Sequence, residues 1–306
     1  MKKILVTGGA GFIGSHLVDR LVDDGHEVLV IDDLSNGRLA NLERSLQGTT
    51  FLERDISIPF NEDEFSDIAA DVIYHLACFP RSQSFANPTR DVEVNVNGMV
   101  NVLELARRSM ARVIFSSNSG IYDTSRIPID EEAEDTPKTP YDLNKLTAER
   151  YLRLYHEAYG VEYAVFRFAT VYGPRQRTSP DWKPVVIEFI DKLSKGQAPT
   201  IYWDGDQTRD FINVKDIVRA LVLAIDSEEA TGETMILGSG VEISINTLYE
   251  TVCNQLGVEI EPKRGPKTLG DIRRMRYDCT KARNILGWKP EVTIDQGVSE
   301  LLGGLE

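Results

Sequence analysis

The chain has 306 residues, of which 42% are hydrophobic and 27% are charged, and its formal net charge is −14. This length suffices for a large buried core, and the composition excludes a small disulfide-stapled scaffold and a wholly disordered chain. The negative charge disfavours nucleic acid and anionic lipid as partners, and no apolar run approaches the ~20 residues that a membrane span needs.

Short apolar and β-branched runs alternate with helical patterns in the first half of the chain. The predicted strands cover residues 4–6, 28–31, 71–74, 112–115 and 162–166. Between the first two, Ile13, Leu17 and Leu21 recur at helical spacing, and residues 100–106 carry a similar pattern. This alternation predicts right-handed βαβ crossovers and therefore an α/β fold with a doubly wound parallel sheet.

The pattern changes beyond residue 170, where glycine and proline interrupt the chain more often. Helical stretches are expected near residues 184–195, 215–226, 245–256 and 294–303. We place a domain boundary between residues 170 and 171, with a smaller α/β region after it. Part of residues 206–237, including the strand-like run 234–237, is expected to return to the main sheet.

Cysteine and histidine spacing gives no sign of a disulfide framework or a metal site. Cys78, Cys253 and Cys279 lie far apart, and the four histidines form no pair at metal-ligand spacing. We therefore predict that no metal is bound. The N-terminus leads into a short apolar run that ends in glycines, without a signal-peptide pattern, so we expect a cytoplasmic protein.

A glycine-rich loop follows the first predicted strand and opens the first predicted helix. Gly8 and Gly11 permit a tight turn and close backbone approach, Gly14 lets the helix pack on the strand, and the helix N-terminus attracts a pyrophosphate. Asp32 ends the second strand 18 residues after Gly14, where a carboxylate accepts hydrogen bonds from a ribose diol. Because Asp32 and Asp33 would repel a 2′-phosphate, the loop predicts a Rossmann domain that binds NAD rather than NADP.

Tyr141 and Lys145 are four residues apart in a predicted helix that opens at Pro140. Residues at this spacing share a helix face, so the phenol and the ammonium can point into one site. A neighbouring cation favours phenolate, so we expect Lys145 to lower the pKa of Tyr141 and to make it a base near neutral pH.

With these two sites the chain resembles an extended short-chain dehydrogenase/reductase, in the nucleotide-sugar epimerase branch typified by UDP-glucose 4-epimerase. The resemblance covers nearly the whole chain. It includes residues 7–16, 32–37, 54–56, 75–77, 95–98, 115–117, 141–145, 171–174, 209–212 and 286–288.

This resemblance implies an NAD-binding domain over residues 1–170 and a mainly substrate-binding domain over residues 171–306. The residues that would hold NAD are Gly8, Gly11, Phe12, Ile13, Gly14, Asp32, Asn36, Asp55, Ile56, Leu76, Ala77, Asn95, Ser116, Tyr141 and Lys145. The substrate would be a UDP-sugar of the UDP-glucose/UDP-galactose type. The residues that would contact it are Thr170, Arg177, Arg209, Asp271 and Arg273.

The resemblance also implies a mechanism with no net redox change. Tyr141 would remove the proton of the sugar 4-hydroxyl while C4 passes a hydride to NAD. The 4-keto sugar would then present its other face and take the hydride back. The implied activity is inversion at C4, with Tyr141, Lys145 and a hydroxyl on the strand after Phe115 as the catalytic groups.

The chain departs from the family at that hydroxyl, because Asn118 stands where Ser or Thr is usual. An amide can donate a hydrogen bond to the sugar 4-oxygen, but it cannot relay a proton as a hydroxyl does. Either Asn118 orients the substrate only, or Ser117 or Ser119 takes over the hydroxyl role; the sequence leaves both alternatives open.

A second departure concerns the diphosphate. Thr268 replaces the usual arginine ahead of Asp271, and Arg273, Arg274 or Arg276 could substitute for it.

A third departure concerns the sugar. Thr170, followed seven residues later by Arg177, resembles UDP-glucuronate 4-epimerases, in which the matching residues face the sugar carboxylate. An arginine fork suits a carboxylate, so the UDP-glucuronate/UDP-galacturonate pair is a second substrate possibility.

Other reactions of the superfamily are disfavoured. Dehydratases and decarboxylases of this kind carry carboxylates just after the catalytic hydroxyl, where this chain has Ser119 and Gly120. A nucleotide-sugar dehydrogenase or reductase and a non-catalytic NAD-binding sensor are the remaining alternatives.

The resemblance implies a homodimer through helices near residues 97–110 and 141–159. The apolar rows on these helices, Val100 with Leu103 and Leu146 with Leu154, fit either such an interface or the intrachain core.

Overall fold

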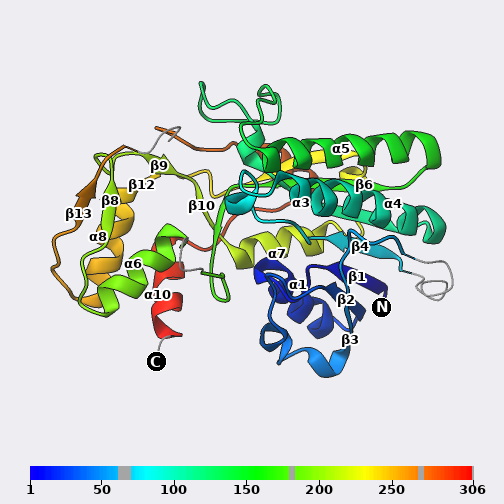
Figure 1. Ribbon diagram of the computed structural model, residues 1–306, viewed down its shortest axis with the longest axis horizontal. Coiled ribbons are helices and arrows are strands. Elements are labelled where there is room, and N and C mark those ends of the chain that lie inside the picture. The colour runs from blue at the N-terminus through cyan, green and yellow to red at the C-terminus, as the bar shows by residue number, and fades with distance from the viewer. Residues whose placement is uncertain (61–69, 179–182, 268–271, 305–306) are drawn as a thin grey trace.

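The structure, a computed structural model, describes residues 1–60, 70–178, 183–267 and 272–304. Its centre is a parallel sheet of seven described strands in the order β11-β6-β5-β4-β1-β2-β3. The strands are β1 (Lys3–Thr7), β2 (Glu27–Asp32), β3 (Thr49–Glu53), β4 (Val72–His75), β5 (Arg112–Asn118), β6 (Tyr163–Phe168) and β11 (Glu233–Leu237). This sheet confirms the predicted doubly wound α/β fold (Figure 1).

Helices cover both faces of the sheet, because side chains alternate between the faces along each strand. In β1, Ile4 and Val6 pack in the cluster that contains α1 (Phe12–Asp23) and α7 (Val214–Leu223). Leu5 packs in the cluster on the other face of the sheet, with α4 (Gly98–Ser109) and α5 (Pro140–Tyr159). Burial on both sides explains the nearly continuous apolar strands of the sequence.

The strand order reverses between β1 and β4, since the chain leaves β1 toward β2 and β3 and returns on the other side of β1 at β4. At such a switch point the loops at the carboxyl ends of the strands diverge and leave a crevice. The loop after β4 leads through a 3₁₀ turn (Arg81–Gln83), α3 (Pro88–Val92) and a π-helical turn (Glu93–Asn97) into α4.

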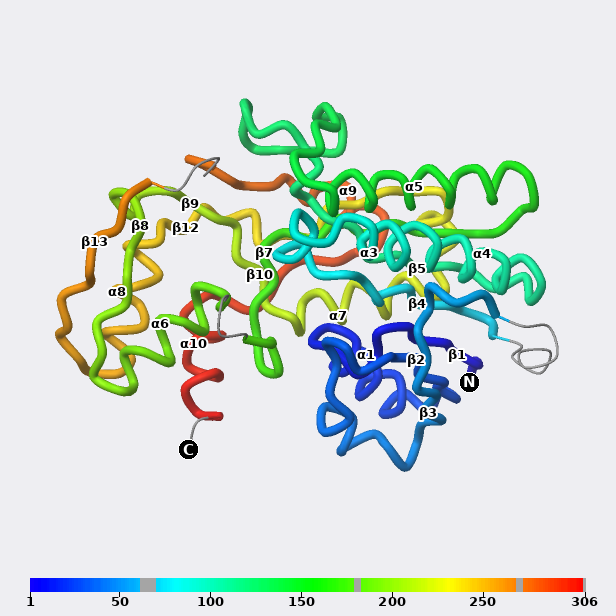
Figure 2. The backbone as a smooth tube through the Cα atoms, in the orientation of Figure 1, coloured from blue at the N-terminus to red at the C-terminus, as the bar shows by residue number. Residues whose placement is uncertain are grey.

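The C-terminal half contributes a smaller group of elements beside the main sheet (Figure 2). The helix α9 (Thr280–Leu286) packs against β11 of the main sheet. The helices of the smaller group are α6 (Val185–Ser194), α8 (Ile245–Leu256) and α10 (Ile294–Gly303), which are three of the four helical stretches predicted beyond residue 170. The fourth is α7, on the main sheet. The short strand pairs in this described part are β7 (Thr170–Tyr172) with β10 (Phe211–Asn213), β9 (Thr208–Arg209) with β12 (Ile243–Ser244), and β8 (Thr200–Tyr202) with β13 (Lys263–Gly265).

The strand predicted at residues 234–237 is β11, which pairs in parallel with β6 at the edge of the main sheet. In the ranges that the structure describes, no helix combines the length and the hydrophobicity required to cross a membrane.

His75 illustrates how burial in this sheet changes a titratable group. Its side chain is fully buried at the end of β4, with Nδ1 2.8 Å from Thr7 Oγ1 and its ring stacked on Phe115. Burial, and to a smaller extent the charge of Lys145, lowers the pKa of His75 from 6.5 to about 3.

We predict that His75 makes the free energy of unfolding depend on pH between about 3 and 6.5. In this range the unfolded chain binds a proton at His75 and the folded chain does not, so the contribution of His75 to stability increases with pH. Urea unfolding of the parent and of His75→Gln at a series of pH values measures this contribution. Identical pH dependence in both proteins would contradict the assignment.

Candidate active site

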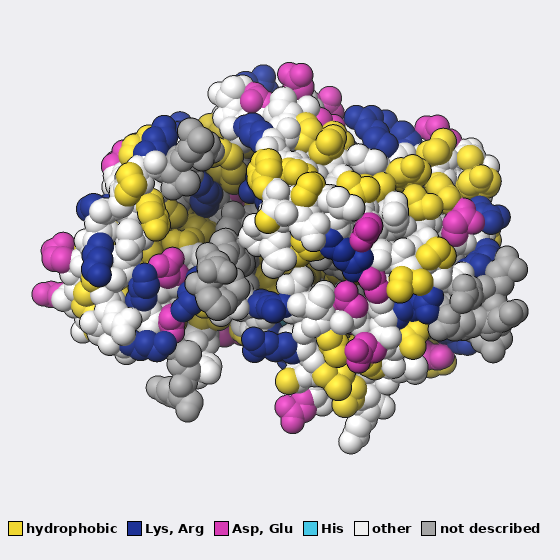
Figure 3. All heavy atoms as spheres, viewed as in Figure 1, with side chains coloured by type: hydrophobic (Ala, Val, Ile, Leu, Met, Phe, Trp, Pro, Cys, Tyr) yellow, Lys and Arg dark blue, Asp and Glu magenta, His cyan; other side chains and the backbone are white. Residues whose placement is uncertain are grey.

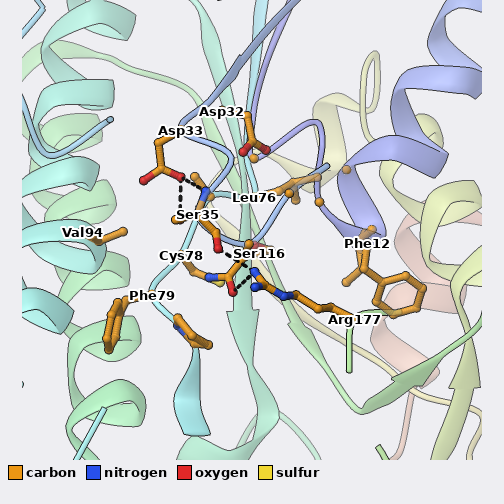
Figure 4. A pocket seen from close by; sticks show the side chains of 18 of the residues that line it. Phe12, Asp32, Asp33, Ser35, Leu76, Cys78, Phe79, Val94, Ser116 and Arg177 are labelled. Atoms are coloured by element: carbon orange, nitrogen blue, oxygen red, sulfur yellow. Dashed lines mark hydrogen bonds between the residues drawn. The ribbon is translucent and has the colours of Figure 1, made fainter. Parts of the chain in front are cut away.

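A cavity of about 560 Å³ lies along the carboxyl ends of β1, β2, β4 and β5. Figure 4 shows part of its wall, with side chains from the β1–α1 loop, the β2 end, the β4 and β5 ends and the segment after β7. This is the crevice that the reversal of strand order predicts.

The glycine loop forms one wall of the cavity. Gly8 has φ +72°, and a Cβ there would lie 2.6 Å from the Ala77 nitrogen; a Cβ on Gly14 would lie 2.1 Å from the Gly8 oxygen. Gly11 caps α1 without any side-chain hydrogen bond, and residues 11–14 line the cavity. The first-turn N–H groups of α1 are therefore not covered by a capping side chain, which suits a bound phosphate.

Two carboxylates lie at the β2 end of the cavity. Asp32 Oδ2 accepts a hydrogen bond from the Ala10 nitrogen and Oδ1 accepts one from the Leu34 nitrogen, both at 2.9 Å. Burial raises the pKa of Asp32, and these two N–H groups act in the opposite direction. Asp33 Oδ1 accepts hydrogen bonds from the Ser35 nitrogen and hydroxyl. A pair of carboxylates fits the hydroxyls of a ribose and repels a phosphate ester, so the glycine loop and this end together fit NAD.

Tyr141 and Lys145 lie on one face of α5 at the opposite end of the cavity. Thr139 caps this helix, with its hydroxyl oxygen accepting from the Asp142 nitrogen. Tyr141 lines the cavity, and Lys145 Nζ lies 5.6 Å from the centre of its ring. The Lys145 side chain is only 2% exposed, and Nζ donates to the Ser116 carbonyl at 2.9 Å.

The expected lowering of the Tyr141 pKa is wrong for this structure. Burial raises the pKa of Tyr141 well above 10, the neighbouring Cys78 thiol acts in the same direction, and the Arg81 charge opposes them only weakly. Burial also lowers the pKa of Lys145. Desolvation therefore outweighs the effect of the neighbouring cation, and the phenol is protonated at neutral pH unless a further positive charge is added.

The three candidates for the family's hydroxyl position are all engaged in hydrogen bonds. Ser117 Oγ donates to Glu149 at 2.5 Å, and Ser119 Oγ donates to the Phe168 carbonyl at 2.6 Å. Asn118 Nδ2 donates to Asp142 at 2.5 Å. Ser117 lines the cavity, whereas Asn118 and Ser119 are not in its wall.

Most of the remaining predicted cofactor residues lie together in the same cavity. Those in its wall are Phe12, Ile13, Asn36, Asp55, Ile56, Leu76, Ala77 and Ser116. Asn95 lies behind the wall, where Oδ1 accepts from the Phe79 nitrogen at 3.1 Å and Nδ2 donates to Asp91 at 2.5 Å. Asn95 therefore supports Phe79, which lines the cavity.

Several cavity residues were not singled out from the sequence. Arg90 donates to Asp55 at 2.5 Å and lines the cavity together with Cys78 and Gln176. Arg54 also lines it, next to Asp55 in one of the family-like motifs. Arg90 lies in α3 and the other two lie in loops, all three outside any motif, so only the fold brings them to the cavity.

The predicted substrate residues are dispersed. Arg177 NH1 donates to the Ser35 carbonyl at 2.5 Å and to Asn36 Oδ1 at 2.8 Å, which places it at the β2 end of the cavity (Figure 4). Its expected contact with a sugar carboxylate stays a prediction. Thr170 is half-buried in β7 and does not line the cavity.

The predicted diphosphate residues lie in the C-terminal region. Arg209 NH1 donates to the Thr208 and Ile272 carbonyls. Arg273 NH1 donates to both Asp204 oxygens at 2.7 Å and its guanidinium lies over the Trp203 ring. Asp271 and Thr268 lie outside the described residues.

A cluster of three or more metal-ligating side chains is absent from the described ranges.

Comparison with known families identifies one match over most of the chain. Residues 4–238 match the profile of the NAD dependent epimerase/dehydratase family. The chain is 35% identical to the putative UDP-glucose 4-epimerase of Methanocaldococcus jannaschii, over 99% of this chain and 98% of that protein. It is 37% identical to the UDP-glucose 4-epimerase of Mycolicibacterium smegmatis, over 97% of this chain and 96% of that protein. It is also 36% identical to UDP-glucuronic acid decarboxylase 5 of Arabidopsis thaliana, over 97% of this chain and 87% of that protein.

Solved structures with the same fold include two sugar-nucleotide complexes. The UDP-glucose 4-epimerase of Thermotoga maritima with UDP-glucose superposes with a TM-score of 0.92 and is 34% identical, over 99% of this chain and 100% of that one. The UDP-glucuronic acid 4-epimerase of Bacillus cereus, in complex with UDP-glucuronic acid and NAD, has a TM-score of 0.89 and 28% identity, over 99% and 100%.

We predict that the protein binds NAD at least roughly tenfold more tightly than NADP, a difference of about 1.4 kcal/mol. The Asp32 and Asp33 carboxylates line the cavity and would repel the additional phosphate. Calorimetric titration of cofactor-stripped protein measures both affinities. Equal affinities for the two cofactors would refute the role of Asp32.

Proposed function

Because the chain belongs to the NAD-dependent epimerase/dehydratase family, we propose that it is a UDP-sugar 4-epimerase that acts through a 4-keto intermediate. NAD is its cofactor. The observation that supports this proposal most is the placement of Tyr141 and the glycine loop in the wall of one cavity, with Lys145 Nζ 5.6 Å from the centre of the Tyr141 ring.

The proposed roles follow from this placement. The N–H groups of residues 11–14 would hold the pyrophosphate of NAD, and Asp32 would hold its adenosine ribose. NAD, when bound, supplies a hydride acceptor and donor for C4 and a positive charge that favours phenolate. The Tyr141 phenolate would take the proton of the sugar 4-hydroxyl and return it to the opposite alkoxide after the keto sugar has turned. A charged Lys145 ammonium would favour the phenolate during this proton transfer.

UDP-glucose and UDP-galactose are the favoured substrate pair. Two relatives named UDP-glucose 4-epimerase match at 35% and 37% identity over nearly the whole chain. Gly120 offers no carboxylate for the elimination or decarboxylation chemistry of other superfamily members. A non-catalytic sensor is less well supported, since both Tyr141 and Lys145 are present and lie together. A net dehydrogenase would share these two residues, and release of NADH distinguishes it from an epimerase.

UDP-glucuronate is the second candidate substrate, because Thr170 and Arg177 resemble the matching pair of UDP-glucuronate 4-epimerases. For Arg177 to reach a sugar carboxylate, it would have to exchange its hydrogen bonds with Ser35 and Asn36 for the substrate. We propose that the region after residue 170 binds the substrate, with Arg209 and Arg273 as the diphosphate contacts.

We also propose a homodimer through the outer faces of α3, α4 and α5. Figure 3 shows apolar side chains gathered over these helices. Those exposed by more than two fifths are Val92, Met110, Leu143, Leu154 and Tyr159. Of the two apolar rows named from the sequence, Leu103 belongs to the core and Leu154 to the surface. Light scattering that found a monomer at micromolar concentration would oppose this proposal.

We predict that Tyr141→Phe lowers kcat by ~10²–10⁴-fold, the range typical of lost general base catalysis, and leaves NAD affinity nearly unchanged. The substitution removes only the phenolic oxygen from a half-buried ring. Tyr151→Phe on the same helix is the matched control and should retain full activity. Lys145→Met should reduce both kcat and NAD affinity. A Tyr141→Phe protein with nearly the parent rate would rule out the proposed base.

We predict that purified protein interconverts UDP-glucose and UDP-galactose without net NADH formation. Separate incubations with UDP-glucose, UDP-N-acetylglucosamine and UDP-glucuronate, followed by chromatographic separation of the C4 epimers, identify the substrate. If UDP-glucuronate is accepted, Arg177→Ala should reduce its turnover by roughly 10- to 100-fold and spare UDP-glucose, as expected for loss of a charge-assisted hydrogen bond. Accumulation of NADH would instead indicate a dehydrogenase, and no C4 epimer of any sugar would refute the proposed function.

A further inference from the structure

We propose that Arg81 and Asp142 are positioning residues that hold the Asn118 amide in one orientation beside Tyr141. Asn118 occupies the place where the family has a hydroxyl, so this proposal rests on the proposed epimerase function for its kinetic consequence. The three residues are far apart in the sequence: Arg81 begins the turn after β4, Asn118 ends β5, and Asp142 follows Tyr141 in α5.

Asp142 is the centre of this group. Its side chain is completely buried, and both carboxylate oxygens accept from Arg81, Oδ1 from Nε and Oδ2 from NH2, each at 3.1 Å. A buried carboxylate is costly unless it is paired and hydrogen-bonded, and the two-point guanidinium contact meets this requirement. The Asp142 carboxylate does not cap α5, because the cap is made by Thr139. Asp142 lies in the first turn of α5, where a negative charge favours the helix, and its carboxylate is in addition free of the capping role and available to Arg81 and Asn118.

The carboxylate determines which end of the Asn118 amide faces it. Asn118 Nδ2 donates to Asp142 Oδ1 at 2.5 Å, and Asn118 Oδ1 accepts from the Gly120 nitrogen at 3.0 Å. A rotation of the amide by 180° would set its oxygen against the carboxylate and its NH₂ group against an N–H group. Both contacts would then be repulsive, so the charge of Asp142 selects a single orientation.

Gly120 closes the third side of the amide. A Cβ at residue 120 would lie 2.9 Å from Asn118 Nδ2 and 3.3 Å from Oδ1, so the amide packs directly on the glycine. The absence of a side chain at residue 120 therefore makes room for the amide at residue 118.

The selected orientation leaves one Nδ2 hydrogen that the described residues do not engage. Asn118 is not itself in the cavity wall, but it directly follows Ser117, which is, and its amide is hydrogen-bonded to the first turn of α5, which carries Tyr141. An amide held in this way can donate to the sugar oxygen that Tyr141 deprotonates, whereas a hydroxyl rotates freely to suit its partners. The positioning pair is consequently needed for an asparagine and dispensable for a serine.

A double-mutant cycle tests this difference in kcat. Asp142→Asn removes the charge but keeps the shape, and we expect it to lower kcat about tenfold with KM changed less than about twofold, as for a 1.4 kcal/mol effect on the transition state. In the Asn118→Ser background the same substitution should lower kcat less than about twofold. Arg81→Lys keeps the positive charge but loses the two-point guanidinium contact with Asp142, and it should lower kcat in the same pattern. Equal losses in both backgrounds would show that Asp142 is merely structural and would overturn the proposal.

A second measurement is independent of the reaction. In protein labelled with ¹⁵N-asparagine, the Asn118 side-chain signals are those missing in Asn118→Ser. We expect a widely separated pair of N–H resonances that exchanges slowly with water, and a loss of this separation in Asp142→Asn and Arg81→Lys. Arg20→Ala, which breaks the exposed Arg20–Asp24 ion pair on α1, is the matched control and should leave the pair unchanged.

The two measurements separate the two proposals. If the parent protein epimerises no sugar, the proposed function fails, and the Asn118 resonances still decide whether Arg81 and Asp142 hold the amide. Asn118 signals that do not respond to Asp142→Asn would overturn the positioning role, whatever the activity of the parent.

Discussion

The close approach between the β1–α1 loop and the end of β4 is the constraint on which the rest of the site depends. Gly8 lies against the Ala77 backbone and Gly14 against the Gly8 carbonyl, so that neither position has space for a side chain. This packing directs the N-terminus of α1 into the crevice created by the reversal of strand order. The ends of β2, β4 and β5 then complete a single cavity around it.

Desolvation governs the chemistry of the groups around this cavity. The Tyr141 pKa is raised and that of Lys145 is lowered, so burial favours the neutral form of both. A base that is held protonated until a positive charge enters the cavity would work only when the cofactor is in place. The Arg81–Asp142 pair shows another response to burial, because the guanidinium and the carboxylate hydrogen-bond each other at two points beside the same phenol.

Features carried by local patterns could be predicted from the sequence, and those created by contacts between distant segments could not. The strand runs, the glycine loop and the four-residue spacing of Tyr141 and Lys145 are local, and the structure contains all three. The direction of the Tyr141 pKa depends on burial, which residue spacing does not reveal. Arg177 contacts Ser35 across 142 positions of sequence, and Asn118 contacts Asp142 across 24 positions. Only the fold reveals contacts between segments so far apart.

In the proposed reaction a hydride leaves C4 of the sugar and returns to the same carbon, on a cofactor that stays bound. Incubation of the protein with UDP-galactose deuterated at C4, in ordinary water, followed by mass and NMR analysis of the product, tests it most directly. We expect UDP-glucose that retains deuterium at C4, with no free reduced cofactor. Inverted product that had lost its deuterium to solvent would contradict it.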